Sequence, residues 1–261
     1  MRRGHDAGSR LRAAVGRAAP PVLGTAGLLT VWWAGVVAFD LPAFLLPAPP
    51  AVAAAIVDQP GYLLHNTAVT AVTAAAGYGL AVATAGLFGA VLAVSGRVGR
   101  AVTPILLLLS TVPKPAVVPI LIVWLGFGAG PKLVLVWLMC FFPIVSATHT
   151  GLTATPAELV DVARSLDASR WQTFTRFRAP AALPYLFSGL RTALPLAVIG
   201  AVVAELFGGT SGLGVVIQTA GTRTDVAFAA VVLLAATSTG LFYLLTAVCE
   251  RAAPWIRHTT A

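Results

Sequence analysis

The sequence predicts an all-α integral membrane protein with about six transmembrane helices and one charged loop between the fourth and fifth. The chain is 58% hydrophobic and 10% charged, with a mean hydropathy of +0.88, which is too apolar for an ordinary soluble domain. Long stretches carry no charged residue, and crossing a bilayer takes about 20 mostly apolar residues. By contrast, seven charged residues crowd into residues 158–178. This crowding predicts a short, folded, solvent-facing element between two spans.

The apolar stretches set the order of the expected elements. Residues 1–17 form a basic cytoplasmic tail, and residues 18–261 form a single transmembrane domain. Between the first two spans, the proline-rich stretch 41–66 predicts an external loop with a surface-lying helix. The third span is interrupted only by Lys114. The six spans are expected at residues 20–39, 67–94, 102–125, 132–151, 184–207 and 226–248.

The placement of the basic residues predicts the orientation of the chain. Arginines gather in the amino-terminal tail, at 97–100, at 164–178 and at 251–257, whereas the opposite side holds only Lys132 and Arg223. Such an excess of basic residues marks the cytoplasmic side. We therefore expect a multi-pass protein of the cell membrane with both termini in the cytoplasm. The net charge of +8 is explained by the basic residues on the cytoplasmic side of the membrane, so no nucleic-acid partner is expected.

The sequence lacks the motifs of a nucleotide-binding protein or an enzyme. The string nearest to a phosphate-binding loop is GFGAGPKL at 126–133, with Pro131 in place of the second glycine and Leu133 in place of the metal-binding hydroxyl. No nucleophile, base and acid combine into a catalytic set. Cys140, Cys249 and the four histidines have no ligand spacing. We expect no catalytic residue, no metal and no cofactor on this chain.

The charged loop, at about 155–180, begins with a predicted helix. Thr155 and Glu158 have the spacing of a capping box, with Pro156 at the first helical position. An apolar stripe follows at i, i+3, i+4 and i+7. Its members are Leu159, Val162, Ala163 and Leu166.

A second short helix is predicted directly after a turn at Asp167–Ala168. Ser169 and Gln172 form another capping box, and Trp171, Phe174 and Phe177 line one side. Pro180 disfavours helix at the preceding residue and is expected to close the element. Two readings stay open on pattern alone, a solvated connector with interfacial helices or a rigid docking element for a cytoplasmic partner.

The loop resembles the cytoplasmic signature of binding-protein-dependent ABC transporter permeases. In that signature, Glu-Ala-Ala is followed after three residues by Gly, and after nine more by Ile, one residue and Leu-Pro. Here Asp161-Val162-Ala163 stands for the acidic start, Asp167 for the Gly, Phe177 for the Ile and Ala179-Pro180 for Leu-Pro. Asp tolerates the left-handed conformation better than most residues, so we expect the turn to survive at some cost.

The resemblance extends over nearly the whole chain. ELVDVARSLDASRWQ, APAALPYLFSGLR, VVAELFGGTSGLG and, upstream, PKPAVVPILIVWLGFG are similar to the branch that moves sulfonates, taurine, nitrate and related small solutes. The resemblance implies that this chain is a non-enzymatic permease subunit of an ATP-driven importer in the lipid bilayer. Its implied partners are two ATPase subunits, a second permease copy and an extracytoplasmic solute-binding protein. The residues implied to couple this chain to the ATPase are Glu158, Leu159, Asp161, Val162, Ala163, Arg164, Leu166, Asp167, Ser169, Arg170, Trp171 and Phe174.

A second group of residues is expected along the solute pathway. Prolines break a span most readily where it lines protein or water. Lys114 and Glu205 would each cost about 2.5–3.5 kcal/mol at the centre of a span. Lys114 either reaches an interface or attracts an anion such as a sulfonate, whereas Glu205 fits a structural or gating role near the external mouth. For His149 and Gln218, interhelical hydrogen bonding is the alternative to lining the pathway. The full group is Pro113, Lys114, Pro119, His149, Glu205 and Gln218.

Two rival functions make different demands on the sequence. An ion-coupled secondary transporter or channel calls for intramembrane carboxylates and an inverted repeat, and the sequence has one candidate carboxylate and no repeat. A membrane scaffold without transport leaves the prolines of the third span unexplained.

Overall fold

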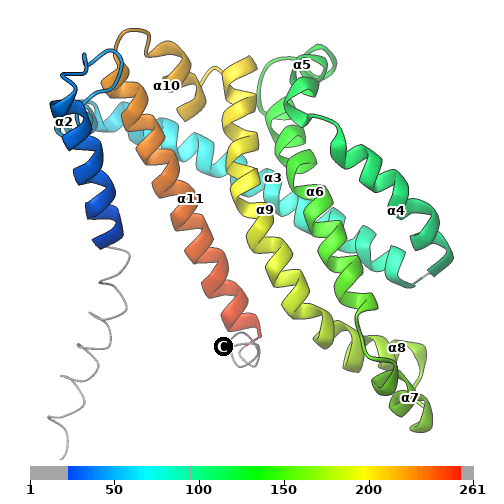
Figure 1. The fold of residues 1–261 in the computed structure, drawn as a ribbon. Coiled ribbons are helices and arrows are strands. Elements are labelled where there is room, and N and C mark those ends of the chain that lie inside the picture. The colour runs from blue at the N-terminus through cyan, green and yellow to red at the C-terminus, as the bar shows by residue number, and fades with distance from the viewer. Residues whose placement is uncertain (1–22, 95, 254–261) are drawn as a thin grey trace, which may run out of the picture. The chain divides into compact units, whose positions relative to one another are not determined.

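The computed structural model describes residues 23–94 and 96–253, which are mostly helical, with short irregular connections, and contain no strand (Figure 1). The basic tail expected at 1–17 and the first three residues of the expected span 20–39 lie outside the described residues. The chain divides into two compact units, residues 1–60 with 220–229, and residues 61–219 with 230–261. Each unit is described separately.

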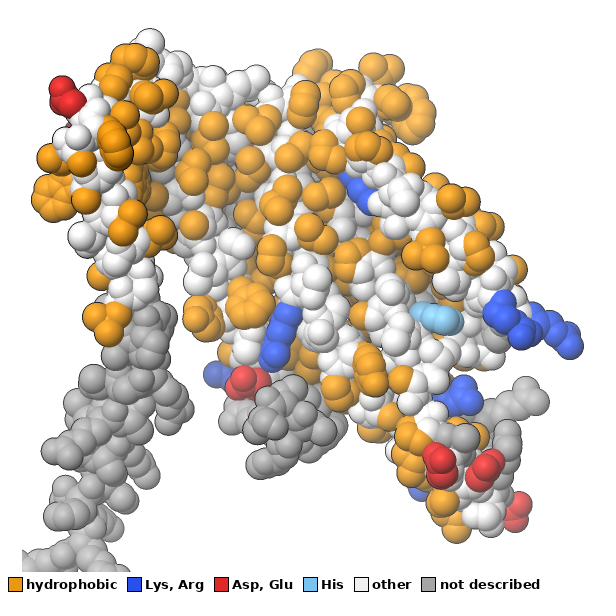
Figure 2. All heavy atoms as spheres, in the orientation of Figure 1, with side chains coloured by type: hydrophobic (Ala, Val, Ile, Leu, Met, Phe, Trp, Pro, Cys, Tyr) orange, Lys and Arg blue, Asp and Glu red, His pale blue; other side chains and the backbone are white. Residues whose placement is uncertain are grey.

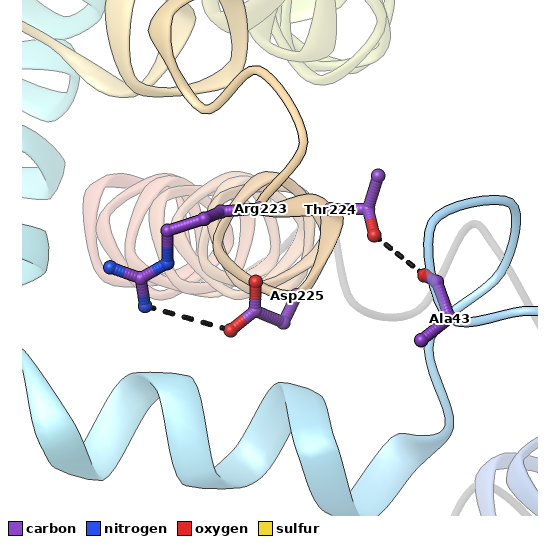
Figure 3. A network of polar contacts seen from close by, with 4 residues as sticks. All are labelled: Ala43, Arg223, Thr224 and Asp225. Carbon is purple, nitrogen blue, oxygen red and sulfur yellow. Dashed lines mark hydrogen bonds and ion pairs between the residues drawn. The ribbon is translucent and has the colours of Figure 1, made fainter.

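The smaller unit joins an amino-terminal helix, Leu23–Ala38, to the start of the last helix of the chain. The Trp32 and Phe228 rings lie 5.9 Å apart between centroids. The Thr224 hydroxyl donates to the carbonyl oxygen of Ala43 over 2.6 Å, and Arg223 lies 3.6 Å from Asp225 (Figure 3). The loop stretch 41–66 holds a helix, α2 (Pro49–Asp58), as expected.

The remaining helices follow one another with short connections. Their bounds are α3 (Pro60–Val94), α4 (Gly96–Thr111), the 3-10 helix η1 (Lys114–Val117), α5 (Val118–Leu125), α6 (Ala129–Thr153), α7 (Ala157–Ser165), α8 (Arg170–Thr173), the π-helix η2 (Phe174–Arg178), α9 (Ala179–Gly208), α10 (Leu213–Thr219) and α11 (Thr224–Ala252).

The core of the larger unit lies where α3, α6 and α9 pack together, and α6 and α9 run side by side in Figure 1. Small residues allow the close approach, as is usual between membrane helices. A Cβ added at Gly77 would lie 2.5 Å from the Cβ of Val136. The Tyr78 hydroxyl donates to the carbonyl oxygen of Leu190 over 2.9 Å, which ties α3 to α9. The core is therefore held by tight contact and by a few buried hydrogen bonds.

Among the residues that the structure describes, four helices are long and apolar enough to cross a membrane: Pro60–Val94, Ala129–Thr153, Trp171–Gly208 and Thr224–Ala252. The expected span 102–125 is broken where its prolines crowd, because Arg97–Thr111 and Lys114–Leu125 meet at an 80° bend. Pro113 and Pro115 stand at this bend, and proline cannot supply the N–H that a continuous helix requires. Counted as one span, the bent pair is a fifth. The sixth, at the amino terminus, stays a prediction.

The expected helix end at Pro180 is also wrong. A single helix runs from Trp171 to Gly208 and passes through the π-helical turn η2, where the Ala179 N–H donates to the carbonyl oxygen of Phe174. A π turn shifts the hydrogen bonds by one residue, so a proline enters the helix without the usual clash with the carbonyl four residues earlier.

Candidate functional site

The turn between α7 and α8 contains a residue with a left-handed backbone conformation. Asp167 adopts a left-handed backbone with φ 51°. The Ala168 N–H donates to the carbonyl oxygen of Ala163 over 3.0 Å, which is the long bond of a Schellman helix end. Ala163 is fully buried. Asp therefore occupies the left-handed position that glycine usually fills, and α7 still ends sharply.

One of the two expected capping boxes is formed. The Gln172 N–H donates to the Ser169 hydroxyl over 3.2 Å, and the Ser169 N–H donates to Gln172 Oε1 over 2.8 Å. The box expected at Thr155 is wrong, because the Thr155 hydroxyl has no partner within the described chain. The helix begins at Ala157, and proline at 156 has no N–H of its own to offer a capping group.

Apolar side chains of α7 and α8 lie open on the surface (Figure 2). Leu166 is 70% exposed and Trp171 72% exposed, and Leu159 and Val162 are exposed as well. The Trp171 ring stacks on Phe174 at 6.0 Å between centroids. We call these four exposed side chains, Leu159, Val162, Leu166 and Trp171, the docking face.

The remaining residues of the expected coupling set surround this face. Glu158, Asp161 and Asp167 are exposed on and after α7, and Ser169 caps α8. Arg164 and Arg170 belong to the two helices by their backbone, while their side chains lie outside the described part of the chain. The loop thus brings the whole expected set onto one two-helix element.

A cavity of about 760 Å³ lies between α4 and α6, beside the bend of the third span. Of the six residues expected along the pathway, Pro113, Lys114 and His149 line this cavity. Pro119, Glu205 and Gln218 do not. The lining residues are Leu92, Thr103, Leu106, Leu107, Ser110, Thr111, Val112, Pro113, Lys114, Pro115, Met139, Phe142, Pro143, Val145, Ser146, His149, Thr150 and Leu196.

Glu205 is fully buried near the opposite end of α9 from the docking face. Its carboxylate accepts from the Thr70 hydroxyl at 3.0 Å and from the Gly214 N–H at 2.9 Å. Lys132 is also buried and attracts the carboxylate electrostatically. The Lys132 ammonium donates to the carbonyl oxygen of Ser211 over 2.9 Å. A buried carboxylate is stable only with such partners.

The same cluster fastens the loop 208–214 to α3. The Gly212 N–H donates to Asn66 Oδ1 over 2.7 Å, and the Leu213 N–H donates to the Thr70 hydroxyl over 2.8 Å. Gly212 has φ 117°, and a Cβ there would overlap the Glu205 carboxylate. We call Asn66, Thr70, Lys132, Glu205 and the loop 208–214 the buried clasp. It fixes where α10 leaves α9.

Sequence reasoning missed the partners of Glu205 and the hydroxyl groups of the cavity. Asn66 and Thr70 stand four residues apart, so they share a face of α3. Two polar residues at this spacing in a charge-free run could have indicated a buried polar contact. Nothing in the sequence tied them to a carboxylate 135 residues away. Within the described residues, no group of His, Cys, Asp or Glu has the arrangement of a metal site.

Residues 82–256 match the family model described as "Binding-protein-dependent transport system inner membrane component". The chain is 37% identical over 228 residues to the riboflavin transport system permease protein RibX of Chloroflexus aurantiacus, covering 86% of this chain and 85% of the relative. It is 31% identical over 237 residues to the taurine transport system permease protein TauC of Escherichia coli, covering 87% and 86%.

A solved structure has the same fold. A chain of the MetNI methionine ABC transporter in an inward-facing conformation matches with a TM-score of 0.63 at 20% identity, covering 77% of this chain and 97% of that one.

Proposed function

This chain belongs to the family of binding-protein-dependent transport system inner membrane components, and from that premise we propose how it works. It is the permease component of an ABC transporter that imports small solutes. In the proposal, two separate ATPase subunits bind the docking face, a second copy of the chain completes the pathway, and an extracytoplasmic binding protein delivers the solute. The solute is a sulfonate, taurine, nitrate or a similar small molecule. Both termini and the loop 155–180 lie in the cytoplasm.

The single observation that carries the proposal is the docking face on a rigid element. A flexible connector would dissipate a partner's movement. Here the turn at Asp167 and the cap at Ser169 hold α7 and α8 at a fixed angle. A displacement of one helix by the ATPase therefore displaces the other.

The helix that follows the docking face supports the transmission of that movement. Trp171 begins a continuous helix of 38 residues that ends at Gly208, and at about 1.5 Å per residue it is about 57 Å long. Its far end carries Glu205 of the buried clasp. Closure of the ATPase pair would therefore move α9 as one body and shift the balance between inward- and outward-facing states.

The rival ion-coupled mechanism finds less support. Its carboxylate would need to be open to an ion, whereas Glu205, the buried carboxylate of the described residues, is already occupied by Thr70 and Gly214. The two mechanisms separate in one measurement, because ATP-driven uptake persists when ion gradients are collapsed and ion-coupled uptake does not.

The experiment compares two tryptophans of equal exposure. Trp171 is 72% exposed on the docking face, and Trp124 is 74% exposed on α5. Each is changed to Ala, and copurification with a coexpressed ABC ATPase subunit is measured. We expect Trp171→Ala to weaken ATPase capture at least tenfold, as removal of an aromatic anchor does, and Trp124→Ala to leave it unchanged.

A second pair of variants tests whether the loss of capture is specific to the Trp171 indole or is shared by the docking face. Leu166 and Leu108 are both 70% exposed, and only Leu166→Ala should reduce capture. Equal capture by all four variants and the parent chain would refute the docking assignment. The absence of any ATPase in the purified complex would refute the proposed function itself.

A further inference from the structure

The cavity between α4 and α6 is lined by one face of each helix. Thr103, Leu107, Ser110 and Thr111 on α4 repeat at helical spacing. On α6 the lining residues are Met139, Phe142, Pro143, Val145, Ser146, His149 and Thr150. The cavity follows both helices from the bend at Pro113 toward His149, whose Nε2 would lie 3.2 Å from a Cβ at Gly99. The cavity is therefore elongated, and the side chains of these two helix faces determine which molecules it can bind.

The hydroxyl groups on the α6 side of the cavity need a polar partner. Ser146 and Thr150 are exposed along a helix that is long and apolar enough to cross a membrane. Within the described chain, neither hydroxyl hydrogen-bonds to another group. In hydrocarbon an unpaired hydroxyl is costly, so polar groups at this depth face water or a bound molecule. The apolar exposed side chains of α4, such as Leu108, are free to face lipid.

The charges of the lining are one-sided. Lys114 is the lysine of the cavity, and the lining holds no Asp, Glu or Arg. Its ammonium donates to the carbonyl oxygen of Ser110 and lies 5.2 Å from the centre of the Phe142 ring. An ammonium has three donors, and the carbonyl uses one of them. The site therefore offers positive charge and free donors, with no fixed anion to balance them.

We infer that this cavity is a solute site for a small organic anion, a sulfonate or a carboxylate. The Lys114 ammonium binds the acid group, the Ser146 and Thr150 hydroxyls donate to its remaining oxygens, and Leu107 and Leu196 face the hydrocarbon part. A volume of about 760 Å³ is within the range of small-molecule sites. The inference rests on the proposed permease function and adds the residues of this chain that bind the acid group of the solute.

The test uses thiol reagents as small charged probes, so it needs neither a known solute nor transport. Ser146→Cys is treated, in the purified complex with its ATPase, with 2-sulfonatoethyl methanethiosulfonate and with its trimethylammonium counterpart. The parent chain gives the blank, because Cys140 and Cys249 are buried. Rates are divided by those of a free thiol. We expect the anionic reagent to react faster, and Lys114→Met to reduce the ratio of anionic to cationic rates about tenfold.

Two controls isolate the charge. Lys114→Arg keeps the cation and should keep the ratio. Thr219→Cys, exposed on α10 outside the cavity lining, should give a ratio that does not respond to Lys114→Met. A Ser146→Cys thiol that reacts with neither reagent, or equally with both, overturns the inference, and so does a ratio indifferent to Lys114. ATP-driven uptake is assayed separately, so a failure of the permease function is distinguishable from a failure of the anion site.

Discussion

Removing the Glu205 carboxylate should release the loop 208–214 and destabilise the whole larger unit. In Glu205→Ala the buried Gly214 N–H loses its acceptor. The Thr70 hydroxyl loses the carboxylate but keeps the carbonyl oxygen of Asn66, 3.1 Å away, as an acceptor. The buried ammonium of Lys132 loses the negative charge that attracts it. The Gly214 N–H and the Lys132 charge are therefore left uncompensated unless the structure opens.

The magnitude follows from the number of groups left unpaired. A hydrogen bond to a charged group contributes about 1.5–3 kcal/mol, and Glu205 accepts two. Removing one partner of a buried charged set costs about 3–5 kcal/mol. For a chain of this size 1 kcal/mol corresponds to roughly 2–4 °C in Tm, so the expected loss is roughly 6–20 °C. Glu205→Gln keeps one acceptor oxygen and should lose about half as much.

The assay is thermal unfolding of the detergent-solubilised chain, followed by the fluorescence of its six tryptophans. Glu158→Ala is the matched control, because it removes an exposed carboxylate of α7 and surface changes are usually within about 0.5 kcal/mol. A Glu205→Ala chain that melts within about 2 °C of the parent would show that the carboxylate does not hold the loop.

Two further predictions concern backbone geometry. Gly212→Ala should lower Tm sharply, because Gly212 has φ 117° and the new Cβ would meet the Glu205 carboxylate. Gly240→Ala is the control, at a helical position with open space around it. It should leave Tm unchanged or raise it, because Ala in a helix is more stable than Gly by roughly 0.5–1 kcal/mol. Asp167→Gly should preserve ATPase capture and Asp167→Val should reduce it, because the left-handed conformation at φ 51° costs a residue with a Cβ roughly 1–2 kcal/mol; equal capture by the two variants would mean that the turn is not needed for docking.

Apart from the capping box expected at Thr155, local sequence signals were reliable where the structure depends on neighbours in the chain. The apolar runs predicted the long helices, because a span needs about 20 apolar residues whatever surrounds it. The spacing of Ser169 and Gln172 predicted the cap that forms. The turn at Asp167 was predicted because one helical pattern ends there, the next begins directly after it, and Asp167 takes the place of the signature's glycine. These features depend on contacts between residues a few positions apart.

The effect of proline on the helices was predicted only in part. Pro113 and Pro115 stand at an 80° bend, in the span that their crowding predicted to be broken, but the sequence did not give the size of the bend. Pro180 was expected to end a helix, yet the helix continues through a π turn. A proline removes one backbone hydrogen bond of the helix. The sequence does not show whether the helix then bends, ends or widens into a π turn. The packing of the neighbouring helices decides among these outcomes.

By itself, the sequence determined that this protein is a helical membrane chain with a charged two-helix loop and the pattern of an ABC permease. Hydropathy, caps and motif spacing are properties of consecutive residues, so they can be read without a fold. Only the tertiary structure decided that Glu205 is enclosed by Thr70 and Gly214, and that Lys114 shares a cavity with Ser146 and His149. These groups lie far apart in the chain, and whether a charge in a membrane helix faces a partner, a cavity or lipid depends on how helices pack around it.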